Sequence, residues 1–171
     1  MSLPVTITDA GYATFYAPVA VKVAAGVTAC AVTIDGNWAT LTAIEGGVIP
    51  ANTGVVLAGA EKAYDFAITT AAAFEGENAL RGTVAATNVT ENAYVLANDA
   101  EGVGFYAAAM TNGAWLNNSH KAYLPKAQGM NAASYSFRFP GTTGIGEVKG
   151  EGGNVKAIYD LTGRKVETIA A

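Results

Sequence analysis

The sequence predicts an all-β protein, an antiparallel β-sandwich or barrel of about ten short strands. Three observations support this fold class. Apolar and polar residues alternate in many short segments, which is the spacing that places side chains on opposite faces of a strand. Gly, Asn and Asp residues separate these segments, as turns do. Apolar residues at helical spacing do not continue over any long segment, so helices are expected to contribute little.

The clearest strands lie near the two ends of the β-rich region. Tyr135, Phe137 and Phe139 alternate with polar residues, and Tyr64 and Phe66 do so in a second segment. Both segments have the pattern of a strand buried on one face. The other expected strands cover residues 5–8, 12–16, 27–34, 38–44, 54–57, 82–86, 93–97, 103–109 and 121–124.

Two dipeptides mark hairpin turns, Asp35-Gly36 and Asn112-Gly113. Each is typical of a type I′ turn, in which both central residues have positive φ. Residues 71–80 are expected to form a loop or one short helix, because Gly76 interrupts any helical pattern there.

A weak internal repeat links two parts of the chain. Residues 52–57 lead into the strand at 64–68, and residues 120–124 lead similarly into the strand at 135–139. A hairpin turn precedes each of these units. The pattern predicts two similar β units packed into one core.

The composition changes after Phe139, which defines three expected regions. Residues 4–140 form the all-β module, residues 141–154 form a Gly-rich linker, and residues 155–171 form a short second element. The second element alternates apolar residues and then reaches a Thr-Gly turn, as the start of a hairpin does.

Composition and charge narrow the class of protein. Apolar residues make up 51% of the chain and charged residues only 14%, a profile that suits a secreted β-protein. The net charge is −4 and the 10 Lys and Arg residues are scattered, so neither nucleic acid nor an anionic membrane surface is an expected partner. No apolar segment is long enough for a membrane span, so membrane insertion is not expected either.

The sequence indicates no catalytic or metal site, and no cofactor is expected. Cys30 is the only cysteine, and its alternation with Val32 and Ile34 predicts a small buried side chain. His120 is the only histidine and follows a polar turn, which favours a solvated or locally hydrogen-bonded ring over a general base. The carboxylates fall singly in turns or, at Glu75 and Glu77, as a loose pair in a loop. The chain is therefore not expected to be an enzyme.

Aromatic residues provide the candidate ligand-binding site. Trp38, Trp115, Tyr106 and Tyr123 are able to form a flat platform for a sugar ring, as in modules that bind carbohydrate on a β-sandwich. Each tryptophan follows a hairpin turn, where it serves equally well to close the end of a core. Both interpretations stay open from the sequence.

The second element, residues 155–171, contains the most specific sequence motif in the chain. It resembles the start of the C-terminal sorting domain found on type IX secretion cargo of Bacteroidota. The basic second half of such a domain does not follow Val166, so this segment alone is not expected to direct sorting. The residues that carry the resemblance are Ile158, Tyr159, Asp160, Leu161, Gly163 and Arg164.

Three other segments, residues 5–16, 78–83 and 144–148, resemble an accessory β module and the short joining sequence that precede such sorting domains. The resemblance implies a non-catalytic module, secreted or held at the outer cell surface, near the C-terminus of a larger exported protein. Its expected partners are an upstream domain of the same polypeptide and the secretion machinery. The alternative is a module that binds carbohydrate or a host protein through exposed aromatic residues.

Overall fold

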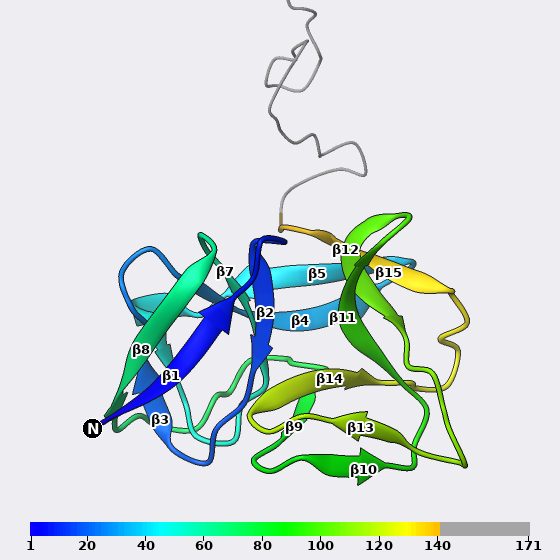
Figure 1. Ribbon diagram of the computed structural model, residues 1–171. Coiled ribbons are helices and arrows are strands. Elements are labelled where there is room, and N and C mark those ends of the chain that lie inside the picture. The colour runs from blue at the N-terminus through cyan, green and yellow to red at the C-terminus, as the bar shows by residue number, and fades with distance from the viewer. Residues whose placement is uncertain (141–171) are drawn as a thin grey trace, which may run out of the picture. The chain divides into compact units, whose positions relative to one another are not determined.

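The computed structural model describes residues 1–140, and it is almost entirely β (Figure 1). One compact unit spans Met1–Phe137. The expected linker at 141–154 and the sorting motif at 158–164 lie outside the described residues. The strands are β1 Ser2–Ile7, β2 Tyr12–Phe15, β3 Ala20–Lys22, β4 Thr28–Asp35, β5 Trp38–Ala43, β6 Val48–Ile49, β7 Val55–Ala58, β8 Lys62–Thr69, β9 Arg81–Thr83, β10 Thr87–Val89, β11 Ala93–Asp99, β12 Gly102–Ala107, β13 Trp115–Asn117, β14 Lys121–Pro125 and β15 Ser134–Arg138, with a 3-10 turn at Glu45–Gly47.

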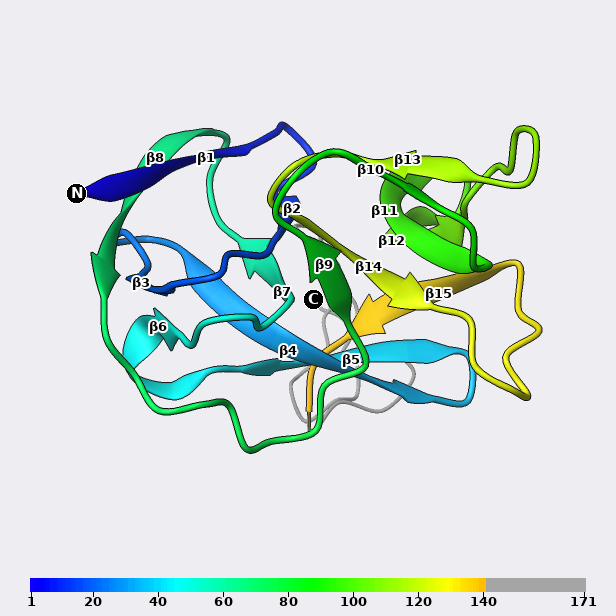
Figure 2. The ribbon, with the colours of Figure 1, turned by 90° about the horizontal axis from the view of Figure 1, so that it is seen from below.

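Nine strands form one antiparallel sheet in the order β2-β7-β4-β5-β15-β12-β11-β14-β9. The sheet curls until β14 lies beside β2 (Figure 2). Two backbone N–H groups donate across this junction: Tyr16 N–H to the His120 carbonyl at 3.1 Å, and Ala122 N–H to Thr14 Oγ1 at 3.2 Å. The predicted sandwich or barrel is confirmed, as a nearly closed barrel.

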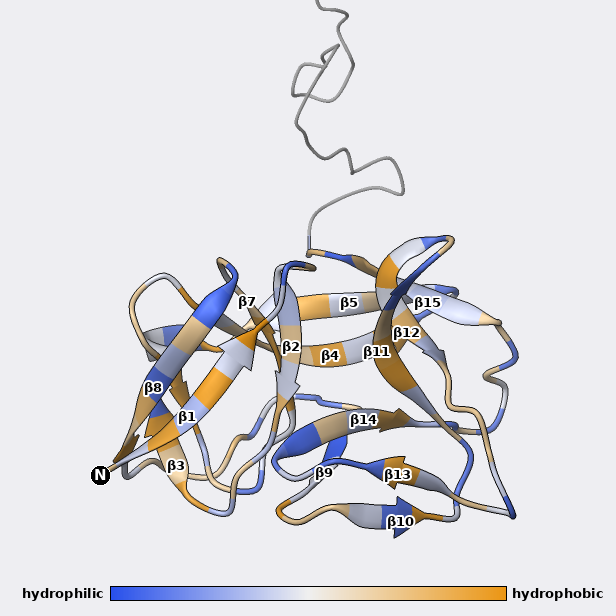
Figure 3. Ribbon diagram, in the orientation of Figure 1, coloured by the Kyte–Doolittle hydropathy of each residue, from blue (hydrophilic) through white to orange (hydrophobic). Residues whose placement is uncertain are grey.

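A four-stranded sheet, in the order β1-β8-β3-β6, covers the outer face of β2, β4 and β7. Alternation along β7 gives this arrangement two cores, because Val55 and Leu57 face the covering sheet while Val56 faces the barrel interior. Tyr64 and Phe66 of β8 pack into the outer core, as their spacing predicts. The hydropathy colours of Figure 3 show apolar positions distributed along these strands.

The two-stranded ribbon of β10 and β13 covers the other end of the barrel in the same way. In β14, Ala122 and Leu124 face the barrel interior, and Tyr123 faces the ribbon together with Trp115. Of the predicted face of Tyr135, Phe137 and Phe139, the first two are confirmed, because both pack into the barrel interior. Phe139 follows the end of β15 and is 41% exposed, so its predicted burial is wrong.

The strands from β2 to β8 and from β9 to β15 form two structural repeats. Four antiparallel pairings of the first repeat, β2–β7, β3–β6, β4–β5 and β4–β7, recur as β9–β14, β10–β13, β11–β12 and β11–β14. Only the last strand differs, since β8 joins the covering sheet and β15 lies between β5 and β12 in the barrel. The prediction of two similar β units is confirmed: they share the barrel interior, and each also has an outer core of its own.

The structural repeat shows that the two predicted hairpin turns, Asp35-Gly36 and Asn112-Gly113, do not correspond to each other. The counterpart of the β4–β5 hairpin is the β11–β12 hairpin, not the turn at Asn112-Gly113. That turn, with φ of 53° and 80°, corresponds to Gly46 and Gly47, with φ of 75° and 65°, in the loop before β6. Turn residues changed between the repeats while their backbone conformation was kept, which conceals the relationship in the sequence.

Three local predictions have different outcomes. Asn112-Gly113 forms the predicted type I′ turn, with positive φ at both residues. The type I′ prediction at Asp35-Gly36 is wrong. Asp35 pairs with Trp38, so the loop residues are Gly36 and Asn37, and of these only Gly36 has positive φ, the pattern of a type II′ turn. Residues 71–80 form a loop without a helix.

Within residues 1–140, the structure has four strands that the sequence pattern did not predict. The additional ones are the short strands β3, β6, β10 and β13, each of two or three residues. Alternation is not recognisable over so few positions, so only long-range pairing defines these strands.

Candidate functional site

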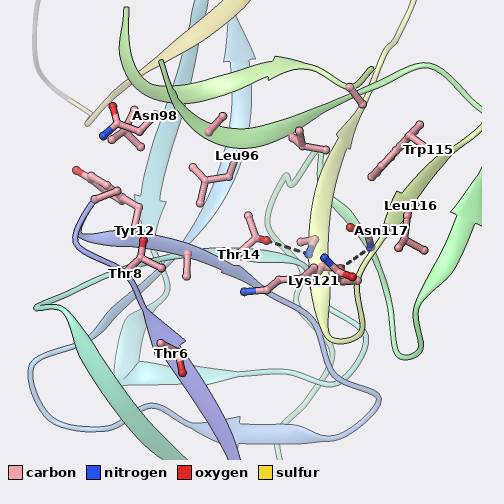
Figure 4. Close-up of a pocket in the computed structure, with 18 of the residues that line it drawn as sticks. Thr6, Thr8, Tyr12, Thr14, Leu96, Asn98, Trp115, Leu116, Asn117 and Lys121 are labelled. Carbon is pink, nitrogen blue, oxygen red and sulfur yellow. Dashed lines mark hydrogen bonds between the residues drawn. The ribbon is translucent and has the colours of Figure 1, made fainter. Parts of the chain in front are cut away.

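A cleft of about 600 Å³ opens beside the junction of β2 and β14 (Figure 4). It is lined on one side by β1, β2 and the turn between them, and on the other by β11, β13 and β14. Hydroxyl and amide groups alternate with apolar side chains along the walls. The lining includes Thr6, Thr8, Asp9, Tyr12, Thr14, Leu96, Asn98, Trp115, Leu116, Asn117 and Lys121.

One wall of the cleft is the open edge of β11. Ala93 accepts a hydrogen bond from Ala108 N–H, and the closing pair of the hairpin is Asp99 with Gly102, so the odd-numbered residues of β11 bond to β12. Even-numbered residues direct their N–H and C=O to the opposite edge. Strand β14 pairs with this edge only at Ala93 and Tyr94. The backbone groups of Leu96 and Asn98 therefore face the cleft.

The facing wall is the open edge of β2. Gly11 and Ala17 accept hydrogen bonds from the β7 side, at 3.0 Å from Gly59 N and 2.7 Å from Asn52 N. By the same alternation, the backbones of Tyr12 and Thr14 point away from β7, toward the cleft. Apart from the two hydrogen bonds at the junction with β14 described above, no strand within residues 1–140 pairs with this edge.

The corresponding place in the first repeat is closed by the chain itself. Val32 in β4 corresponds to Leu96 in β11, because each lies two residues after the last residue paired with β7 or β14. Val32 N–H donates to Asn78 Oδ1 at 3.1 Å, and Ala79 N–H donates to the Val32 carbonyl at 2.7 Å. The residues before β9 thus cover this edge of β4, whereas the edge at Leu96 is left uncovered by any described residue.

Lys121 places a positive charge in the cleft. Figure 4 shows its side chain directed across the cleft toward the side of β1 and β2. Burial lowers the pKa of its ammonium group, because desolvation disfavours the charged form. Asp9 lines the same cleft, but the ion pair recorded for residues 1–140 joins Arg81 and Glu91 elsewhere. The ammonium group of Lys121 has no carboxylate partner among the described residues.

Two of the four predicted aromatic ligand residues belong to the core. Trp115 is 7% exposed and Tyr123 is 6% exposed, and their rings meet edge to face at 84°. The Trp115 indole N–H donates to the Glu91 carbonyl at 3.0 Å. Burial raises the pKa of the Tyr123 hydroxyl. A perpendicular buried pair supplies no flat surface for a sugar.

The other two predicted residues, Trp38 and Tyr106, are half-buried and lie on the outer face of the barrel. Their strand neighbours Ala39 and Phe105 face the interior, so these two rings point outward. Strand β15 lies between their strands, β5 and β12. Tyr106 also donates from its hydroxyl to the Gly102 carbonyl at 2.6 Å. The structure does not bring the four aromatic residues together into one platform.

The surroundings of Cys30 and His120 indicate that both side chains have structural roles. Cys30 is 1% exposed, and burial raises the pKa of its thiol to about 11, so the protonated form dominates at neutral pH. His120 Nδ1 lies 2.9 Å from the Tyr16 carbonyl oxygen, and its ring stacks on Phe15. The prediction of a buried thiol is confirmed. The prediction of a solvated or locally hydrogen-bonded histidine is wrong in its partner, because the ring is part-buried and bonds to a carbonyl 104 residues away in the sequence.

Residues 1–140 contain neither a group of three or more potential metal ligands nor a helix long and apolar enough to cross a membrane.

The sequence reasoning missed the residues that define the cleft, Leu96, Asn98, Thr14 and Lys121. The alternation of β11 assigns its side chains to faces, but it does not show which strand edge lacks a neighbour. A signal for Lys121 was present, since it is a charged residue at the start of an otherwise apolar strand.

No family model, no curated protein and no solved structure matches this chain.

Proposed function

We propose that residues 4–140 form a non-catalytic accessory module of a larger exported protein, secreted or held at the outer cell surface. The observation that carries this proposal is that the two most reactive side chains, Cys30 and His120, have structural roles. The thiol of Cys30 is buried, and the ring of His120 is bonded to the backbone of a neighbouring strand. A nucleophile needs access to a substrate, which the Cys30 thiol does not have, and Nδ1 of His120 is already engaged by a backbone carbonyl.

The way the repeats are joined supports a role as a rigid spacer. Strand β15 from the second repeat lies between β12 and β5, and β5 belongs to the first repeat. The two repeats therefore share one continuous sheet and one barrel interior. A module that cannot bend between its halves holds an upstream domain at a fixed distance from whatever follows it.

Export is proposed from the composition and from the resemblance of residues 158–164 to a type IX sorting domain. The test is to label intact Bacteroidota cells that express the full-length gene product with an antibody against residues 4–140. Labelling of intact cells is expected, and labelling only after lysis would contradict the proposal. A reporter carrying residues 141–171 alone is expected to stay inside the cell, while one carrying a complete sorting domain is exported.

The absence of catalysis is tested separately on the purified chain. Incubation with glycoside, ester and peptide substrates is expected to give no turnover above a heat-denatured control. Hydrolysis that copurifies with the folded protein and is lost in Cys30→Ala or His120→Ala would show that the module is an enzyme.

Carbohydrate binding is the second candidate function, and the outward position of Trp38 and Tyr106 favours it. Binding on a glycan array that is lost in Trp38→Ala and in Tyr106→Ala, but kept in Trp38→Phe, would support a sugar platform on this face. Binding unchanged by both alanine substitutions would exclude these residues as the platform.

A further inference from the structure

The cleft lies where the barrel lacks a strand. Along most of the barrel each strand edge is bonded to a neighbour, but beyond the contact of β2 with β14 two edges face each other unpaired. The backbone groups of Leu96 and Asn98 line one side, and those of Tyr12 and Thr14 line the other. Unpaired strand edges are templates for a further strand, because each N–H and C=O gains a partner on pairing.

The first repeat shows that a peptide backbone fits an edge of this kind. Asn78 and Ala79 lie against β4, with bonds of 3.1 and 2.7 Å to the two backbone groups of Val32. Leu96 has the corresponding place in β11 and the same orientation of its N–H and C=O. An extended peptide beside Leu96 would therefore repeat an arrangement that the fold already contains.

Charge and shape indicate which side chains such a peptide carries. The ammonium group of Lys121 enters the cleft without a carboxylate partner among the described residues, and burial there disfavours its charge. A carboxylate brought by a ligand would supply that partner. Leu116 also lines the cleft, and because it is 57% exposed it offers an apolar contact to a ligand. A volume of about 600 Å³ lies in the range of sites that enclose a ligand of a few residues.

We propose that this cleft binds an extended acidic peptide segment, which adds as a strand along the open edge of β11 and places a carboxylate at Lys121. The site gives the accessory module a protein partner. The proposal goes beyond the function proposed above, and its test measures neither export nor turnover, so the two can fail independently.

The test uses the full chain, labelled with ¹⁵N, and a set of seven acetylated heptapeptide amides. In each peptide Thr and Val alternate, and a single Glu occupies one of the seven positions. At least one is expected to shift the amide resonances of Leu96 and Asn98 and to slow their hydrogen exchange. The same peptide with Lys in place of Glu, or with alternate amides N-methylated, is expected to bind at least about tenfold more weakly.

Two pairs of variants separate the backbone edge from the charge. Asn98→Pro removes the N–H that faces the cleft without removing a bond to β12, and Asn98→Ala is its control because it keeps that N–H. Lys121→Met removes the charge, and Lys121→Arg keeps it. Affinity is expected to fall about tenfold in Asn98→Pro and in Lys121→Met and to change less than about threefold in the two controls.

Four results would overturn the proposal. The first is failure of all seven peptides to bind at millimolar concentration. The second is equal binding of the N-methylated peptide, which would exclude strand addition. The third is unchanged affinity in both Asn98→Pro and Lys121→Met, with chemical shifts showing that each variant is folded. The fourth is a perturbation of Leu96 and Asn98 by polygalacturonate oligosaccharides but not by any peptide, which would identify the cleft as a glycan site.

Discussion

Asn52 and His120 have the same left-handed backbone conformation, with φ of 59° and 57°, at the same place in the two structural repeats. Each lies in the loop just before the strand that pairs with the first strand of its repeat, β7 or β14. Each also donates its backbone N–H back to that first strand's end, to Ala17 at 2.7 Å and to Thr83 at 2.9 Å. Two chemically different residues therefore preserve one backbone turn.

Substitution of Asn52 tests the importance of this turn. Asn52→Ala is expected to lower the free energy of unfolding by about 1 kcal/mol, because alanine adopts the left-handed conformation less readily than asparagine does. Asn52→Gly is expected to cost less, since glycine adopts this conformation freely. Urea unfolding of both variants provides the measurement. Equal losses would show that the Asn52 side chain, which accepts a bond from the Tyr16 hydroxyl, matters more than the backbone.

Gly82 is expected to tolerate no side chain. A Cβ at this position would lie 2.3 Å from Cγ of Tyr16, whose ring packs on the glycine. Gly82→Ala should therefore lower the free energy of unfolding by about 1–3 kcal/mol, as overpacking does. The control is a double-mutant cycle with Tyr16→Ala. The cost of Gly82→Ala should shrink once the Tyr16 ring is removed, and an unchanged cost would place the strain elsewhere.

Hydrogen exchange is expected to distinguish Val32 from Leu96 in the free protein. The two amides have corresponding places in the repeats, but among the residues that the structure describes only that of Val32 has an acceptor, Asn78 Oδ1. Under conditions where exchange reports local opening, the Leu96 amide should exchange at least about tenfold faster. Asn78→Ala should accelerate exchange at Val32 and leave Leu96 unchanged. Equal protection of the two amides in the native chain would mean that the edge of β11 is covered.

Cys30 is expected to make stability fall at high pH. Burial raises the pKa of its thiol from 9.0 in the unfolded chain to about 11 in the folded one, so the folded state holds the proton more tightly. The stabilisation is fully present below pH 9 and is lost as the pH rises toward about 11, by roughly 2 kcal/mol. Urea midpoints of Cys30→Ala should show a smaller decline over this range. Burial and the neighbouring Cys30 also raise the pKa of Tyr12, so both proteins are compared in a Tyr12→Phe background, which isolates the thiol.

Lys121 is expected to contribute binding chemistry at a small cost in stability. Burial holds its pKa below the ordinary 10.5, so the folded state binds this proton less tightly than the unfolded state does. Stability should therefore rise as the pH passes from the lowered pKa to 10.5. Lys121→Met should raise the free energy of unfolding at neutral pH by a few tenths of a kcal/mol, and should lack this rise. Destabilisation by Lys121→Met would instead indicate a structural partner for the ammonium group.

The sequence by itself determined the local features of this protein. Alternation at Tyr64 and Phe66, and at Tyr135 and Phe137, defined strands together with the faces they bury, because period-2 spacing fixes the side of the sheet. The burial of Cys30 followed from the same spacing. Residues 158–164, which carry the resemblance to a sorting domain, lie outside the described residues, and their role stays a prediction.

Only the tertiary structure decided which strand edges are paired and which are open. Val32 finds its partner Asn78 at a separation of 46 residues, and Ala122 finds Thr14 at a separation of 108. Backbone N–H and C=O groups are the same in every residue, so the choice of partner depends on how distant strands pack and not on local side-chain patterns. For this reason the cleft between Leu96 and Thr14 is a property of the folded barrel, and the sequence pattern alone did not reveal it.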